Sequence, residues 1–186
     1  MPITLDLDAG QGNGPMYLVV RLGQGFANPP VPPFNANDPP AAVAQRVGGY
    51  WPMGLDPGKK ADRVHQALGA GRPVFVIATW QAEVIRVMQM SLKPSMPIGN
   101  PETDVLGNSF VPLANQPAVY QWPGQDGAVW ACRYKSAEVG TRTRIMLAPT
   151  NDAAWIGERL LWGNEVTNSY WNYTYSTGFA APLALK

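Results

Sequence analysis

The chain of 186 residues has little of what most catalytic and metal sites require. It contains one cysteine, Cys132, and one histidine, His65. A single cysteine excludes an internal disulfide and a cluster of thiolate metal ligands. One histidine and one cysteine also fall short of the three or four nitrogen and sulfur ligands of a zinc site. The sequence therefore predicts no metal, no cofactor and no catalytic residue, and a buried, inert thiol at Cys132.

Charge is scarce as well. Charged residues make up 15% of the chain, against roughly 25% in ordinary globular domains. The formal net charge is +1, which is too small for attachment to nucleic acid or membrane through a broad electrostatic field. A metal-dependent nuclease would need Asp56, Asp62 or Glu83 to converge with Lys60, and no strand-anchored spacing joins them.

Two kinds of segment are missing from the sequence. The first residues, MPITLDLDAGQGNG, have neither the basic nor the apolar region of a signal peptide. No apolar run approaches the ~18 residues that span a bilayer. We therefore expect a soluble, cytoplasmic protein with no membrane partner. The length predicts a single domain over residues 1–186, long enough to bury a core.

Glycine and proline are abundant, at 19 residues each, so turns are many and long helices are not expected. Residues 23–40 hold six prolines in 18 positions. They predict a loop or a polyproline-like arm on the surface, followed by a short helix over 40–47 with Asp38 as its N-cap. Residues 91–127, also rich in proline and asparagine, predict an irregular insertion.

Apolar, β-branched runs predict the strands. Residues 16–22 form one, and residues 72–79 and 82–90 form a tight antiparallel hairpin around Trp80-Gln81. A second hairpin is expected from residues 128–136 and 141–149, and the aromatic C-terminal region closes with a last strand. In residues 82–90 the alternation places Val84, Arg86, Met88 and Met90 on one face and Glu83, Ile85 and Val87 on the other.

Two more short helices complete the expected elements. One ends near Leu68 with Gly69 after it, and another spans 153–161 with Asn151-Asp152 as its cap. The fold class predicted is mainly β or α+β, a small and mostly antiparallel barrel with two or three short helices and long irregular loops. A doubly wound sheet does not fit this order of elements.

Aromatic residues are the surplus of this chain, with seven Trp and seven Tyr. Most such rings belong to a core. Trp51 and Trp80 lie at element ends beside small or polar residues, where a ring can face a cleft, and basic residues nearby in sequence can contact phosphate. The candidate ligand-binding residues are Arg46, Tyr50, Trp51, Lys59, Lys60, Arg72 and Trp80.

Four segments resemble a PUA/EVE-like domain of the type attached to GIY-YIG nuclease domains. They are LVVRLGQGF, RVGGYWPMGLDPGKKAD and RPVFVIATWQAEVIRV within residues 16–90 and, more loosely, RLLWGNEV within 159–185. Trp51 matches the turn tryptophan of that family, and Arg46 precedes it by five residues. The resemblance implies a PUA-like β-barrel that recognises a modified base or nucleotide. The catalytic residues of the GIY-YIG nuclease are absent, so nuclease activity is not implied.

The sequence therefore predicts a non-enzymatic recognition module whose aromatic pocket binds a modified nucleobase in nucleic acid, as a monomer or dimer. An alternative is a structural or assembly protein, such as a virion or surface β-protein, that wraps a neighbour with its Pro-rich arms. An enzyme built around His65 is a further alternative. The oligomeric state separates the first two, because a shell protein assembles in a concentration-dependent way.

Overall fold

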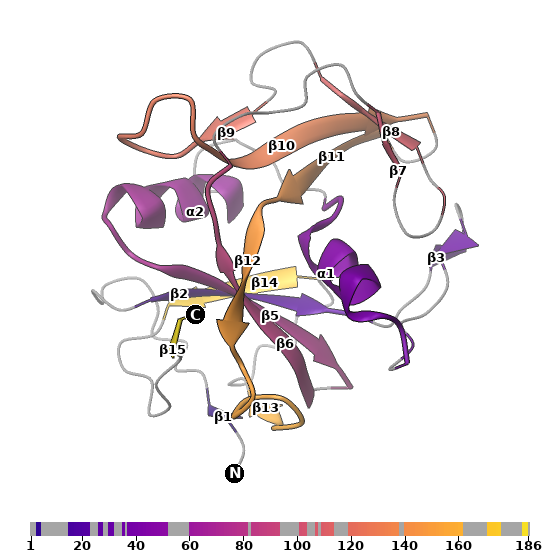
Figure 1. Cartoon of the computed structure of the whole chain (residues 1–186), viewed down its shortest axis with the longest axis vertical. Coiled ribbons are helices and arrows are strands. Elements are labelled where there is room, and N and C mark those ends of the chain that lie inside the picture. The colour runs from indigo at the N-terminus through magenta and orange to yellow at the C-terminus, as the bar shows by residue number, and fades with distance from the viewer. Residues whose placement is uncertain are drawn as a thin grey trace.

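The structure is a computed structural model of a mainly β protein with two principal sheets and two helices (Figure 1). This confirms the mainly β or α+β class expected from the sequence. The described residues are 3–4, 15–22, 26–27, 30–31, 35, 37–51, 60–81, 83–93, 101–103, 107, 109–113, 119–137, 140–161, 171–175 and 184–185.

The first sheet has six strands in the order β14-β2-β5-β6-β12-β15. Its strands are β2 (Met16–Arg21), β5 (Val74–Trp80), β6 (Glu83–Met90), β12 (Leu147–Asn151), β14 (Trp171–Tyr175) and β15 (Ala184–Leu185). Four of the five neighbouring pairs are antiparallel, and β2 with β5 is parallel. A parallel pair needs a long crossover, which residues 22–73 supply. The described pairings are mostly antiparallel, as expected, while closure into a barrel stays a prediction.

The expected hairpin of β5 and β6 is confirmed, but the alternation predicted along β6 is wrong. The register shifts near the turn, and Ile85 becomes an extra residue on β6. Such a bulge changes which side chains share a face. Val84 consequently packs in a different core cluster from Met88 and Met90, on the other side of the sheet.

The second sheet has the order β11-β10-β8-β7, with β9 also paired to β10. Its strands are β7 (Glu102–Thr103), β8 (Ser109–Pro112), β9 (Val119–Gln121), β10 (Val129–Ser136) and β11 (Gly140–Ile145). The hairpin of β10 and β11 is confirmed. The second strand, predicted over residues 141–149, is too long, because β11 ends at Ile145 and residues 147–149 belong to β12 of the first sheet.

The expectation of an irregular insertion over residues 91–127 is too broad. Within it, β7, β8 and β9 belong to the second sheet, because Phe110 and Tyr120 are buried against the neighbouring strands. Residues 94–100, 104–106, 108 and 114–118 lie outside the described residues. The Pro-rich segment 23–40 is described only in part, and there β3 (Phe26–Ala27) pairs with β4 (Pro30–Val31).

The two helices are α1 (Pro40–Gly48) and α2 (Lys60–Gly69), close to where the sequence placed them. Asp38 is not the N-cap of α1. That position is Pro39, which has no side-chain cap, while the Asp38 carboxylate accepts a bond from the Asn35 N–H. After α2 the backbone turns at Gly71, which has a φ of 71°, a conformation that favours glycine.

The third helix expected over residues 153–161 is wrong. Residues 153–157 form a turn, and β13 (Leu160–Leu161) pairs with β1 (Ile3–Thr4). The Asp152 side chain does not cap a helix, because its carboxylate accepts the N–H of Val87 on β6 at 3.0 Å. Asp152, which the sequence suggested as a helix cap, is instead held by a hydrogen bond to a residue distant in sequence.

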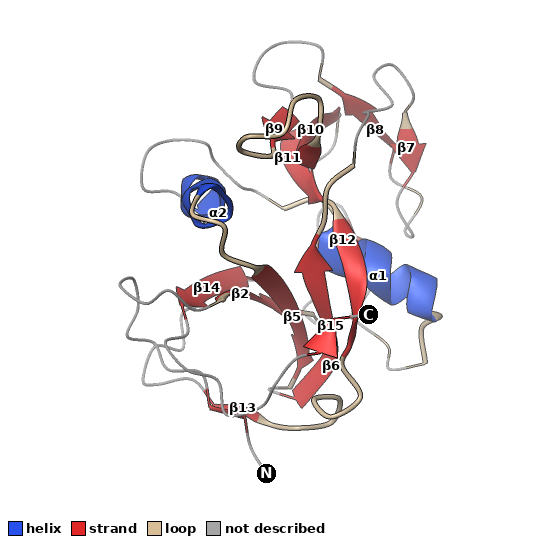
Figure 2. Cartoon of the chain, turned by 60° about the vertical axis from the view of Figure 1, so that its left-hand side comes forward, coloured by secondary structure: helices blue, strands red, loops and turns tan. Residues whose placement is uncertain are grey.

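The first sheet is buried on both faces. Leu18 and Val76 belong to the larger core cluster, which also takes residues from both helices and from the second sheet. Tyr17 and Phe75 pack on the opposite face with Trp155. Figure 2 shows α2 and the second sheet on one side of the first sheet. Burial on both faces explains why β2 and β5 read as continuous apolar runs.

Candidate functional site

The main candidate site is a groove of about 690 Å³ between α1 and β12, here called the α1–β12 groove. Strand β12 passes from the second sheet to the first, and α1 lies beside it (Figure 1). At Gly48 a Cβ would lie 2.9 Å from the carbonyl oxygen of Ile145, so glycine permits this close approach of α1. The apolar lining comprises Pro40, Ala44, Met88, Ile145, Leu147 and Ala148.

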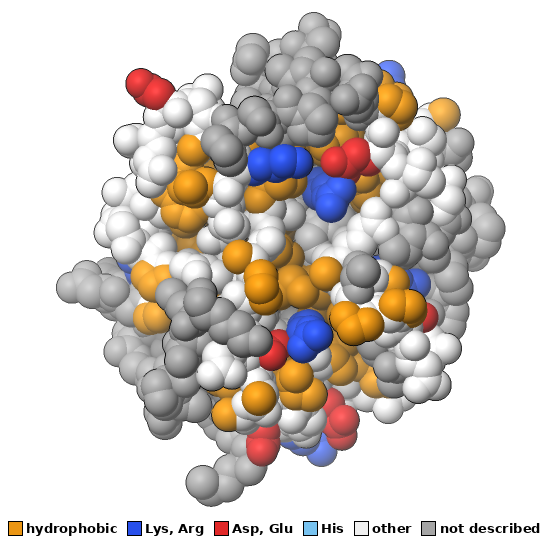
Figure 3. All heavy atoms as spheres, viewed as in Figure 1, with side chains coloured by type: hydrophobic (Ala, Val, Ile, Leu, Met, Phe, Trp, Pro, Cys, Tyr) orange, Lys and Arg blue, Asp and Glu red, His pale blue; other side chains and the backbone are white. Residues whose placement is uncertain are grey.

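Two arginines line the groove, one on a strand of each sheet. Arg86 is on β6 and Arg144 is on β11. In Figure 3 this face of the molecule shows basic side chains beside acidic ones above and below a stretch of hydrophobic side chains. The volume of the groove lies within the range of ordinary small-ligand sites. Its lining combines aliphatic side chains with two guanidinium groups.

Arg144 belongs to a network with an acidic residue and a tyrosine. Its Nη1 pairs with Oε2 of Glu102, and the hydroxyl of Tyr50 donates to the same oxygen at 2.9 Å. The Tyr50 ring stacks on Phe110, with ring centres 3.7 Å apart, and meets the edge of Tyr134 at 5.6 Å. The aromatic packing fixes the hydroxyl that holds Glu102.

In this network the pKa of the acidic Glu102 is lowered and the pKa values of Arg144 and Tyr50 are raised, so each moves further from neutral pH. Burial raises the pKa of Glu102, but the Arg144 charge and the Tyr50 hydrogen bond outweigh burial and hold it below its usual value. Burial lowers the pKa of Arg144, and the Glu102 charge more than reverses that effect. Burial, with Glu102 adding to it, raises the pKa of Tyr50. A general acid or base needs a pKa near the working pH, so this network is better suited to binding than to proton transfer.

Cys132 lies on β10 beside the network and is fully buried. Burial, with a smaller contribution from the Glu102 charge, raises the pKa of its thiol to about 12. The thiolate is the reactive form of cysteine, so the thiol is inert in the folded protein. The burial expected of Cys132 is confirmed.

Arg86 has a looser ion pair. Its Nη1 lies 3.6 Å from Oδ2 of Asp152, and that same oxygen accepts the N–H of Val87. The hydroxyl of Thr150 donates to the carbonyl of Val87 at 2.6 Å. The backbone N–H and the backbone carbonyl of Val87 are therefore both hydrogen-bonded to side chains in or next to β12. These bonds position the backbone of the neighbouring Arg86 at the groove.

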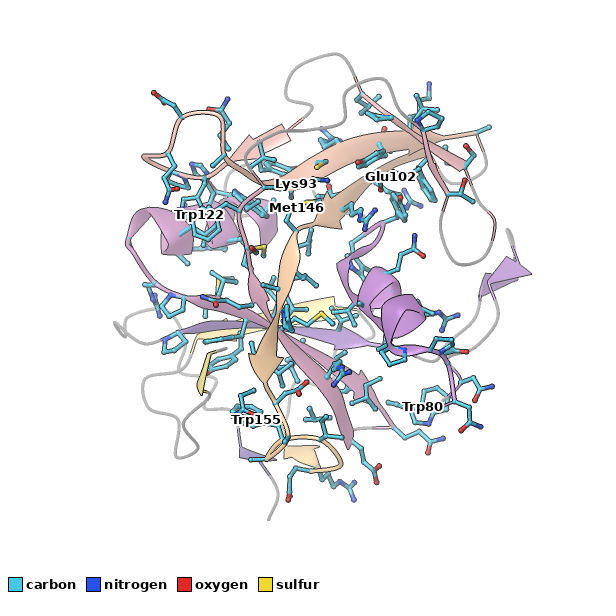
Figure 4. The ribbon with its side chains drawn as sticks, in the orientation of Figure 1. Trp80, Lys93, Glu102, Trp122, Met146 and Trp155 are labelled. Atoms are coloured by element: carbon cyan, nitrogen blue, oxygen red, sulfur yellow. The ribbon has the colours of Figure 1, made fainter. Side chains whose placement is uncertain are left out.

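Trp51 and Trp80 do not line the α1–β12 groove. Trp51 follows α1, pairs with Thr143 on β11, and donates its indole N–H to the carbonyl of Val47 at 2.9 Å. Trp80 lies at the hairpin end of β5, paired with Glu83, and Figure 4 shows it far from Glu102 in that view. Both rings are partly buried against the larger core cluster. The structure therefore favours packing over ligand stacking for Trp51.

The other predicted site residues are dispersed. Arg46 lies in the last turn of α1, and Arg72 lies between α2 and β5; neither lines the groove. Lys60 begins α2, its side chain is not described, and Lys59 lies outside the described residues. Among the predicted residues whose side chains the structure describes, Tyr50 joins the groove network, through Glu102. His65 is exposed on α2.

Sequence reasoning missed Arg86, Glu102, Arg144 and Asp152 as site residues. A signal was present for Arg86, a single arginine within the apolar run EVIRVMQM. Burying a charged side chain in a strand costs free energy unless an opposite charge or a hydrogen-bond acceptor lies beside it. Such an arginine therefore indicates a nearby acidic residue and an opening to solvent. No comparable local signal marks Glu102, whose partner Arg144 is 42 residues away.

Comparisons with known proteins leave the function open. No family model matches the chain, and no curated protein or solved structure matches it. Among the described residues, no helix is both long and apolar enough to cross a membrane. In the same part of the chain, no group of three or more His, Cys, Asp or Glu side chains is arranged to hold a metal ion.

Proposed function

We propose that this chain is a non-enzymatic recognition module that binds one nucleotide unit of a nucleic acid strand in the α1–β12 groove. The observation that carries the proposal is the pairing of an aliphatic lining with two guanidinium groups, Arg86 and Arg144, in one groove of nucleotide size. Arginine suits phosphate because its fork of N–H donors matches two phosphate oxygens. The resemblance to PUA/EVE-like domains, itself part of this proposal, supports the same ligand class.

The site differs from the one predicted from the sequence. Its described lining contains Met88, Ile145 and Leu147 and no aromatic ring, so the flat face of a base packs on aliphatic side chains. Aromatic stacking is worth about 1–3 kcal/mol per base, and aliphatic contact provides dispersion and apolar burial without the π-face. Affinity for one nucleotide is therefore modest.

Weak salt dependence is expected because the net charge is +1 and two arginines face the groove. For single strands the slope of log K against log[salt] is about −0.7 per phosphate neutralised. One or two phosphate contacts predict a slope of about −0.7 to −1.4. A slope several times steeper would indicate attachment along an extended backbone track instead of recognition in one groove.

The test is a fluorescence polarisation titration with labelled single-stranded oligonucleotides of mixed sequence at several salt concentrations. The double variant Ala44→Trp/Ala148→Trp fills the groove from α1 and β12, and binding should fall at least tenfold with the melting temperature retained. Leu92→Trp, at an exposed position outside the groove, is the control for added bulk and should bind as the parent does. No binding by the parent, or unchanged binding by the filled groove, would contradict the proposal.

Assembly through the Pro-rich residues 23–40 stays a prediction from the sequence, because much of that segment lies outside the described residues. Sedimentation of the chain at increasing concentration tests it. A monomer or dimer at all concentrations supports a recognition module, and growth of larger species supports an assembly protein.

A further inference from the structure

We infer that Arg86, and not Arg144, contacts the phosphate of the ligand, so that the α1–β12 groove has a phosphate end on the first sheet and a base end on the second. This inference rests on the function proposed above and assigns a direction to the same groove. It follows from the difference between the ion pairs that the two groove-lining arginines make with Glu102 and with Asp152.

The charge of Arg144 is already balanced. Its partner Glu102 also takes the Tyr50 hydroxyl on the same carboxylate oxygen, and both side chains are about three-quarters buried, with exposed fractions of 28% for Arg144 and 21% for Glu102. A phosphate at Arg144 would have to displace this carboxylate or lie beside its negative charge. Like charges in a partly desolvated site repel strongly, so this end disfavours an anion.

Arg86 is available to an anion. Its guanidinium lies 3.6 Å from Asp152, beyond the usual hydrogen-bond range of about 2.7–3.2 Å. Its side chain is 34% exposed, whereas that of Asp152 is 10% exposed. The Asp152 carboxylate also serves the backbone N–H of Val87. Asp152 also lines the groove, so a phosphate at Arg86 has a carboxylate nearby as well. The two arginines differ in that Asp152 does not hold Arg86 within hydrogen-bond range. Arg86 can therefore direct its N–H donors to a phosphate while Asp152 keeps its bond to Val87.

A polar but uncharged group suits the other end. Gln45, which lines the groove on α1, donates its side-chain amide to the carbonyl of Thr103 at 3.0 Å. This bond leaves the Gln45 amide oxygen as an acceptor in the groove that Arg144 also lines. Donors and acceptors held side by side are what the edge of a nucleobase requires. The Arg144 end thus fits the base.

Lys93 is the other cation to consider on this face. It is exposed and follows β6, and Figure 4 shows it near the second sheet. It pairs through its backbone with Val129 and does not line the groove. Lys93→Gln removes one positive charge from the same face without touching the groove, and so it is a matched control for general electrostatic attraction.

The experiment compares three probes by isothermal titration calorimetry: a nucleoside, its 5′-monophosphate, and inorganic phosphate. The parent should bind the monophosphate about 10–100-fold more tightly than the nucleoside, as expected for one charge-assisted contact. Arg86→Gln should remove that difference and leave nucleoside affinity within about threefold. Lys93→Gln should preserve the difference. Arg86→Lys should retain part of it, because charge remains and the bidentate fork is lost.

The Arg144 end is tested with Arg144→Gln/Glu102→Gln, which removes both charges of the pair together and avoids an unpaired buried carboxylate. This double variant should weaken nucleoside and monophosphate equally and keep the difference between them. If it removes the difference while Arg86→Gln keeps it, the assigned direction is wrong and the proposed function stands. If the parent binds none of the nucleosides and monophosphates, the proposed function fails and this inference fails with it.

Discussion

The two sheets differ in what holds them together. The first sheet is buried on both faces, with aliphatic side chains such as Leu18 and Val76 at its centre. The second has shorter strands and depends on ring contacts around Tyr50 and on the Glu102–Arg144 ion pair. Burial of aliphatic side chains stabilises the first sheet. The second sheet also buries residues such as Trp130 and Ile145 in the larger core cluster, and directional polar and ring contacts add to that burial. The candidate groove lies where the two meet, along α1 and β12.

This difference has a functional meaning. A site needs polar groups held in fixed positions by rigid elements, and the second sheet supplies such a group in Arg144 while the first supplies Arg86. The first sheet also provides the stable support on which the groove is built. Changes in the first sheet should therefore alter stability most, and changes in the second should alter stability less but with a marked dependence on pH.

The largest effect is expected from Leu18→Ala on β2. Leu18 is completely buried in the larger core cluster, and removing such a side chain leaves a cavity that costs about 2–5 kcal/mol. Chemical denaturation monitored by tryptophan fluorescence measures this loss. The control is Val111→Ala on β8, where the side chain is 51% exposed, and a change within about 0.5 kcal/mol is expected. Equal losses at both positions would remove the contrast between the sheets.

A smaller effect with a pH signature is expected from Glu102→Gln on β7. Loss of the ion pair and of the charged acceptor for Tyr50 should cost about 2 kcal/mol at neutral pH. Because the folded-state pKa of Glu102 is lowered, its stabilisation is complete above the usual glutamate pKa of about 4.3. It is lost as pH falls through the folded-state value.

The measurement is the free energy of unfolding of parent and variant between about pH 3 and pH 7. The gap in unfolding free energy between the two proteins should stay constant from neutral pH down to about pH 5 and should narrow below that pH. Tyr50→Phe, which removes one donor to Glu102 and keeps the charge pair, is the matched control and should lose about half as much. A gap that is constant with pH would show that Glu102 acts only through packing.

The sequence predicted most of the first sheet because its strands carry the signal locally. β2, β5 and β6 are apolar runs bounded by turn residues, and the loop at Trp80-Gln81 is short enough to specify the hairpin. The bulge at Ile85 was not predictable, because it depends on pairing with β5 and not on the run itself. The parallel pairing of β2 with β5 was also missed, since 52 residues separate the two strands.

The α1–β12 groove was not predicted from the sequence, for a physical reason. The prediction relied on Trp51 and Trp80, whose rings pack against the core, and on basic residues that are neighbours only in sequence. The groove depends on contacts between distant residues, 42 apart for Glu102 and Arg144 and 65 apart for Val87 and Asp152. Spacing along a chain carries no information about such pairs. Tyr50 was found because an aromatic residue after a helix is a visible local feature.

The measurement that tests the groove most directly is an NMR titration of the parent protein with a nucleoside 5′-monophosphate. The protein is labelled at the Met, Ile, Leu and Ala methyl groups and with nitrogen-15 at the tryptophan indoles. The largest shifts should occur at Met88, Ile145, Leu147 and Ala148, which line the groove. Ile77, in the core cluster on the other face of the first sheet, should not move. Shifts confined to the indole N–H signals of Trp51 and Trp80, or no shifts at saturating nucleotide, would show that the α1–β12 groove is not the recognition site.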